Sequence, residues 1–137
     1  KGEINHEAFT LFYEECHHPL LYNGDLVSLR QIHDMEERYP RLAGLMIGRG
    51  LLARPSLAKE YIEGKEWSHE EHIRCLQSLH EAIKGQYAHI VKGETQLHSK
   101  LRPFWEYTEP IIGHKPYKKI MKSGNLRNYT NAVQELL

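Results

Sequence analysis

The chain has 137 residues, with eighteen Lys and Arg balanced by eighteen Asp and Glu. This zero net charge excludes a uniformly basic nucleic-acid binder, and 40% hydrophobic with 26% charged residues is typical of a globular domain rather than a disordered chain. No apolar run approaches the ~18 residues that a membrane helix needs, and the polar opening residues do not resemble a secretory signal. We therefore expect a cytoplasmic protein about the size of one domain, with no membrane segment.

Charge is unevenly distributed along the chain. Residues 1–91 carry ten basic and fourteen acidic side chains, whereas residues 92–137 carry eight basic and four acidic ones. A basic C-terminal third suggests an anionic partner. A solvated helix face produces the same pattern, so charge alone does not decide between these two interpretations.

The first 64 residues alternate between helical and strand patterns. Asn5 is a good N-cap for a first helix, which would bury Phe9, Phe12 and Cys16 on one face. The pattern then predicts, in chain order, a buried strand at 19–22, a helix at 28–39, a second buried strand at 42–47 and a helix at 51–62 around Pro55. Strand, glycine loop and helix in repeated order predict parallel neighbouring strands. Two parallel strands are not stable alone, so this segment is expected to be a piece of a larger α/β fold.

The rest of the chain shows only helical patterns. Gly64 and Trp67 mark the junction, which divides the chain into an α/β part at 1–64 and an all-α part at 65–137. In the second part the pattern predicts helices at 68–91, 95–107, 116–122 and 126–137, with a kink at Pro103 and a loop at 110–113.

A glycine-containing loop follows each predicted strand. The two loops are Asn23-Gly24-Asp25 and Gly48-Arg49-Gly50. Glycine lets a backbone approach a phosphate closely, Arg49 supplies a guanidinium that suits phosphate, and Asn23 can donate through its amide. Two such loops in successive units predict a phosphate site, although a glycine after a strand is often only a turn. For Asp25 we predict an Asx-type turn that braces its own loop.

These motifs closely resemble those of one enzyme family. The segments Tyr22-Asn23-Gly24-Asp25-Leu26 and Met46-Ile47-Gly48-Arg49-Gly50-Leu51-Leu52-Ala53-Arg54-Pro55, followed by helices, are similar to the tRNA-dihydrouridine synthases. Those enzymes consist of a (β/α)8 TIM barrel followed by a helical domain. The resemblance implies that residues 1–64 are the last β/α units of the barrel and that residues 65–137 are the helical tRNA-binding domain. Because a complete barrel needs roughly 250 residues, the chain would be the C-terminal half of such an enzyme, mostly helical overall.

The resemblance also implies a cofactor, a partner and a reaction. In this family FMN, reduced by NADPH, passes a hydride to the uracil C5=C6 bond of a uridine in tRNA. The residues implied to hold the FMN phosphate are Asn23, Gly24, Gly48 and Arg49. The candidate tRNA contacts are Lys100, Arg102, Lys118, Lys119 and Lys122. Trp105 and Tyr117 are alternative base-stacking candidates, but the apolar stripe around Trp105 favours a core position.

No catalytic residue is predicted in this chain. The family's acid is a cysteine in an Asn-x-Gly-Cys-Pro-like motif, and neither Cys16 nor Cys75 lies in such a motif. We expect both to be structural thiols and the 137 residues alone to have no synthase activity. We also expect no metal site, because His69 and His72 lack the spacing of a zinc hydrolase, and His80 is expected in the core.

Two other functions are compatible with the same residues. Residues 65–137 would serve as a stand-alone helical RNA-binding module, or the chain would belong to another FMN-dependent TIM-barrel dehydrogenase. Members of the latter class share the phosphate loops but should lack the basic helical tail. A barrel that is cut through its sheet exposes strand edges, so we also expect a homodimer or strand swap through those edges.

Overall fold

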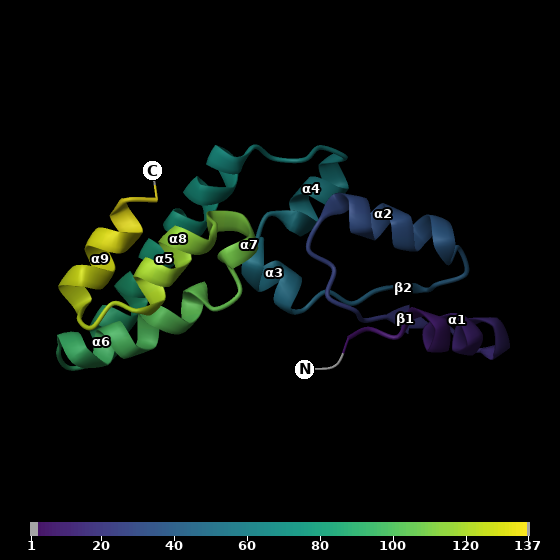
Figure 1. Cartoon of the computed structure of the whole chain (residues 1–137), viewed down its shortest axis with the longest axis horizontal. Helices are drawn as coiled ribbons and strands as arrows, with labels where there is room; N and C mark the ends of the chain where they lie inside the picture. Colours follow the sequence, from purple (N-terminus) through teal and green to yellow (C-terminus); the bar gives the residue numbers. More distant parts are fainter. Residues whose placement is uncertain (1–2, 137) are drawn as a thin grey trace.

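The computed structural model describes residues 3–136 as a mostly helical chain with two groups of elements (Figure 1). The first group consists of α1 (His6–Glu15), β1 (Leu21–Tyr22), α2 (Leu29–Arg38), β2 (Gly44–Leu45), α3 (Arg49–Ala53) and α4 (Leu57–Glu63). The second consists of α5 (His69–Ile90), α6 (Glu94–Leu101), the 3-10 helix η1 (Arg102–Trp105), α7 (Glu109–Ile112), α8 (His114–Met121) and α9 (Leu126–Gln134). The two groups touch where α3 contacts α7.

The predicted parallel pairing of the two strands is confirmed. Leu21 lies opposite Gly44 and Tyr22 opposite Leu45, with α2 as the crossover between the strands. Both strands are shorter than predicted, and the expectation of complete burial is wrong for Leu21, which is 59% exposed. Successive side chains of a strand point to opposite faces, so Tyr22 is buried beneath the helices while Leu21 lies on the uncovered face.

An aromatic cluster packs α1 onto the strand–helix unit. The Phe9 ring lies 4.8 Å from that of Tyr22 and 5.0 Å from that of Tyr39, both edge-on. Tyr13 packs on Tyr39 and accepts a 2.8 Å hydrogen bond from the backbone N–H of Arg41. The core face of α1 therefore contains the i,i+4 pair Phe9 and Tyr13, and the prediction that Phe12 is buried is wrong because that side chain points to solvent.

The helix predicted at 51–62 is divided into α3 and α4. Pro55 has no N–H to donate to a helix, and a residue before proline avoids helical backbone angles. Arg54 accordingly has φ −137° and ψ 80°, so α3 ends at Ala53. The chain resumes its helix at Leu57, whose side chain is completely buried.

Arg54 and Glu60 form a buried ion pair at this break. Arg54 Nε donates to Glu60 Oε1 at 2.9 Å, and the guanidinium also donates to Oε2. The two side chains are 6% and 0% exposed. The Ser56 hydroxyl donates to Glu60 Oε1 at 2.6 Å, and the backbone N–H of Trp67 donates to Oε2 at 2.9 Å. Glu60 thereby ties α4 to the segment that leads into α5.

His72 on α5 extends the same network. Its Nδ1 lies 3.0 Å from the Ser56 oxygen, and because the Ser56 proton goes to Glu60, Nδ1–H is the donor. Burial, followed by the positive charge of Arg54, lowers the pKa of His72. Burial disfavours the Glu60 carboxylate, but the hydrogen bonds that it accepts, first that of Arg54 and then that of Ser56, lower its pKa from 4.5 to about 2.

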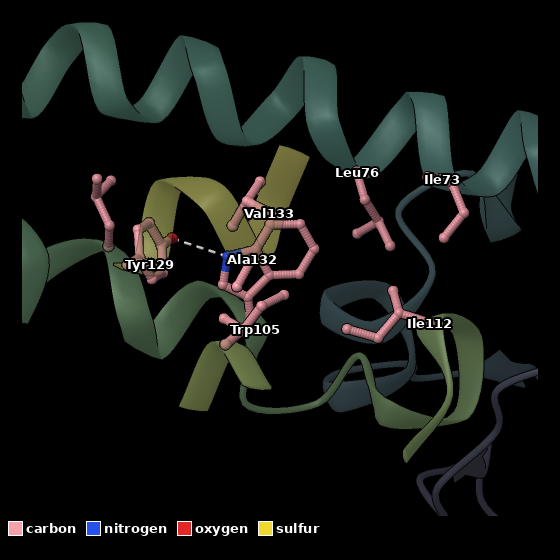
Figure 2. Close-up of a cluster of buried hydrophobic side chains, with 9 residues drawn as sticks. Ile73, Leu76, Trp105, Ile112, Tyr129, Ala132 and Val133 are labelled. Carbon is pink, nitrogen blue, oxygen red and sulfur yellow. Dashed lines mark hydrogen bonds between the residues drawn. The ribbon is translucent and has the colours of Figure 1, made fainter. Parts of the chain in front are cut away.

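The helical group is organised around Trp105 and Tyr129 (Figure 2). Trp105 Nε1 donates to the Tyr129 hydroxyl at 2.8 Å, and that hydroxyl lies 2.6 Å from His80 Nε2. Because the hydroxyl accepts from Trp105, its proton is directed at His80. All three side chains are buried, which confirms the predicted core positions of Trp105 and His80 and removes Trp105 from the candidates for base stacking.

Most predicted helices of this group are confirmed, with one correction. Ser68 and Glu71 form the capping box that starts α5, and the segment around Pro103 becomes the 3-10 helix η1. The loop predicted at 110–113 is wrong, since residues 109–112 form α7. Proline is tolerated in the first turn of a helix, and α7 buries Ile112 against the core of this group.

We predict that Glu60→Gln destabilises the chain by roughly 3–5 kcal/mol, because it removes the buried carboxylate that faces Arg54 and leaves only the exposed Glu66, 3.0 Å away, as its charged partner. Chemical denaturation at neutral pH measures this loss. Glu63→Gln is the matched control on the same helix, where an exposed i,i+4 pair with Lys59 contributes only about 0–1 kcal/mol.

The pH dependence gives a second check on this pair. The pKa of Glu60 is lower in the folded chain (about 2) than its ordinary value of 4.5, so its stabilising contribution is complete above pH 4.5 and is lost as the pH falls toward 2. Glu60→Gln should remove that part of the acid dependence. Equal stability of the two Gln variants, or an unchanged acid profile, would show that the pair is not important for the fold.

Candidate functional site

Both glycine loops leave the sheet at the same edge. β1 and β2 are parallel, so the segments that follow Tyr22 and Leu45 lie side by side. They enclose an open cavity of about 370 Å3. The residues of this cavity that bear on its chemistry are Asn23, Gly24, Asp25, Gly48, Arg49 and Gly50. The structure thus brings together all four residues that the sequence predicts for phosphate.

Close backbone packing holds the loops together. A Cβ added at Gly50 would lie 1.8 Å from the carbonyl oxygen of Leu26, so only glycine allows the start of α3 to approach the first loop this closely. A Cβ at Gly24 would lie 2.3 Å from the Tyr22 hydroxyl oxygen. Gly48 differs, because a Cβ there would meet nothing within 4 Å. Gly24 and Gly50 therefore allow close packing, whereas Gly48 leaves open space beside Arg49.

An ion pair joins the two loops across the cavity. Arg49 Nη2 donates to Asp25 Oδ1, and the two side chains are 40% and 51% exposed. Asp25 has φ +33°, in the left-handed region, where it is the only non-glycine residue among those the structure describes. The predicted Asx turn is replaced by this cross-loop contact. Sequence reasoning missed the pair because 24 residues separate its members, and no local pattern marks it.

The chemistry of this cavity suits a small anion. Arg49 provides a planar set of N–H donors, the exposed Asn23 amide adds donors, and the open side of Gly48 leaves room for the ligand's oxygens. A larger cavity of about 590 Å3 lies between α2, β2 and α4. Its lining is mainly apolar, with Ile32, Leu45 and Ile62 among its residues, so the smaller cavity is the better candidate for an anion.

The structure gathers three of the five candidate RNA contacts on one helix. Lys118, Lys119 and Lys122 line a shallow groove along α8, together with His114 and Lys115. Within this set, Lys119 forms an ion pair with Glu135 of α9. The other two candidates are exposed elsewhere: Lys100 lies on α6 and Arg102 begins η1. We call the α8 set the α8 basic face.

The two cysteines lie apart, one at the end of α1 and one on α5. Burial raises the pKa of the Cys75 thiol, which is opposite to the activation of a nucleophilic cysteine. Cys16 lies at the end of α1, where its Sγ is 3.7 Å from the carbonyl oxygen of His18. Within residues 3–136, no three His, Cys, Asp or Glu side chains are grouped as metal ligands.

Comparison with known proteins identifies the family. A family model described as dihydrouridine synthase matches residues 2–136, nearly the whole chain. The chain therefore belongs to the dihydrouridine synthase family. No curated protein gives a significant match. Among the described helices, none is both long and apolar enough to cross a membrane.

We predict effects of different size for two alanine substitutions in the second loop. Gly50→Ala should lower stability by roughly 1–3 kcal/mol, because its methyl group collides with the backbone of Leu26. Gly48→Ala should cost less than about 1 kcal/mol, since the added methyl group enters open space. Thermal unfolding of both variants measures the difference. Equal stability of Gly50→Ala and Gly48→Ala would contradict the close contact between Gly50 and the backbone of Leu26.

Proposed function

We propose that this chain is the part of an FMN-dependent tRNA-dihydrouridine synthase that binds the phosphate of the flavin and contacts the tRNA. The observation that carries the proposal is the convergence of both glycine loops, with Arg49, on one polar cavity. Membership of the dihydrouridine synthase family indicates the class of reaction, the formation of dihydrouridine. The residues proposed to hold the phosphate are Asn23, Gly24, Gly48 and Arg49.

The two groups of elements support an assignment to two domains. Residues 1–64 would be the last two β/α units of a (β/α)8 barrel, in which phosphates commonly bind at the loops after the seventh and eighth strands. The parallel order of β1, α2 and β2 agrees with that topology. Residues 65–137 would be the helical domain, and their buried cluster around Trp105 is separate from the cluster around Tyr22 and Leu57.

The proposed role of these residues is binding and orientation. FMN, reduced by NADPH, supplies the hydride for the uracil C5=C6 bond in enzymes of this family. Arg49 would bind the phosphate group of FMN by charge-assisted hydrogen bonds. The glycines would let that phosphate lie close to the backbone of the two loops. The family's proton-donating cysteine motif is not in this sequence, so we propose that the 137 residues are inactive by themselves.

FMN titration of the chain, followed by flavin fluorescence, tests the phosphate site. We predict saturable binding that Arg49→Ala weakens about tenfold or more, because a hydrogen bond to a charged group contributes about 1.5–3 kcal/mol. Riboflavin lacks the phosphate, so its affinity should be the same for both proteins. Arg30→Ala on the exposed face of α2 is the control. An FMN affinity that Arg49→Ala leaves unchanged would contradict the site.

We further propose that the α8 basic face contacts the tRNA backbone. Lys118 and Lys122 lie one turn apart on that face and are better candidates than Lys119, whose ammonium group is paired with Glu135. Cations that are positioned along a helix suffice for backbone contact. Lys100 and Arg102 would extend the contact beyond α8.

Charge reversal tests the RNA contact. Lys118→Glu/Lys122→Glu should weaken tRNA binding and reduce the slope of log affinity against log salt by about one for each lysine–phosphate pair that is removed. The control pair Lys59→Glu/Lys65→Glu makes the same charge change away from α8. Equal weakening by both pairs would contradict a specific role for α8.

The proposed inactivity of the 137 residues is tested on the same tRNA. The recovered tRNA should contain no newly formed dihydrouridine, as determined by mass spectrometry after digestion.

A further inference from the structure

The contact between Asp25 and Arg49 is unusual for a surface ion pair. Its members come from loops that follow different strands, and the approach of Gly50 to Leu26 brings them within reach. Asp25 also holds a left-handed backbone conformation at φ +33°. A half-exposed ion pair contributes little to stability, and non-glycine residues adopt this conformation at a cost. Stability alone therefore gives little reason for the arrangement.

The contact leaves most of the guanidinium available. Arg49 lies between two glycines in the sequence, so its own neighbours offer no side chain to restrain it. Asp25 engages Arg49 through Nη2, whereas a guanidinium also presents N–H groups on Nε and Nη1 in the same plane. The Asp25 carboxylate thus holds one amino group of Arg49 in place, while the other donors stay free for a second anion.

We propose that Asp25 is a positioning residue that holds the Arg49 guanidinium ready for the flavin phosphate. This inference rests on the proposed phosphate site and adds a residue to it. A long side chain that is already restrained loses less conformational freedom when the ligand binds. Asp25 acts through Arg49 and needs no contact with the phosphate.

The competing effect is electrostatic repulsion. The Asp25 carboxylate and a phosphate are both anionic, so the carboxylate would weaken binding if it did nothing except lie nearby. Because the Asp25 and Arg49 side chains are about half exposed, solvent around the carboxylate reduces that repulsion, and the restraint on Arg49 outweighs it. The two effects predict opposite consequences of neutralising Asp25, which makes them separable by experiment.

The test compares FMN with riboflavin in Asp25→Asn and in the unmodified chain. The measured quantity is the phosphate advantage, defined as the riboflavin dissociation constant divided by that of FMN. We expect Asp25→Asn to reduce this ratio about threefold to tenfold with unchanged riboflavin affinity. Asparagine tolerates the left-handed conformation as aspartate does, and circular dichroism checks the fold. Asp34→Asn, an exposed acid on α2, is the matched control and should change nothing.

A double-mutant cycle separates positioning from a structural role. In an Arg49→Ala background, Asp25→Asn should have no further effect on the phosphate advantage, because the group that it restrains is gone. An unchanged ratio in the single variant would overturn the proposal, and an increased ratio would show that Asp25 competes with the phosphate. If the unmodified chain binds FMN no tighter than riboflavin, or if Arg49→Ala leaves the ratio unchanged, the proposed phosphate site itself is wrong and this assignment is overturned with it.

Discussion

The backbone of Gly50 lies against the carbonyl oxygen of Leu26, and the geometry of the candidate site depends on this contact. A side chain at position 50 would begin 1.8 Å from that oxygen, so glycine is required for the second loop to come so near the first. Parallel pairing of β1 and β2 brings both loops to one edge of the sheet, and the glycine contact closes the remaining gap. Arg49 reaches Asp25 as a result.

A second constraint connects the site with the helical group. The helix that begins at Arg49 ends before Arg54, whose guanidinium is buried against Glu60. Glu60 in turn accepts from the backbone of Trp67 at the entrance to α5. Removing one member of a buried ion pair destabilises a fold more than replacing both members by apolar residues does, because the remaining charge is then buried without its partner. The segment from the second glycine loop to the first long helix of the proposed RNA-binding domain is therefore held by buried, hydrogen-bonded charges.

Local signals in the sequence predicted most elements, and tertiary contacts account for the rest. The capping box at Ser68 and the repeated strand–glycine–helix order depend on neighbouring residues, so they could be recognised without a structure. The pairing of Asp25 with Arg49 depends on how two distant loops meet, and α7 forms where Pro110 suggests only a loop. On α1, helical spacing allowed either Phe12 or Tyr13 to face the core, and the contact with the segment after α2 selects Tyr13.

The proposed function requires that the two glycine loops form one binding site for the flavin phosphate. A backbone amide NMR spectrum of the labelled chain, recorded during addition of FMN, tests this requirement residue by residue. We predict that the largest shifts occur at residues 23–25 and 48–50, and that they are much smaller with riboflavin. Shifts confined to the apolar cavity between α2, β2 and α4, or equal shifts with both flavins, would rule out a phosphate site at these loops.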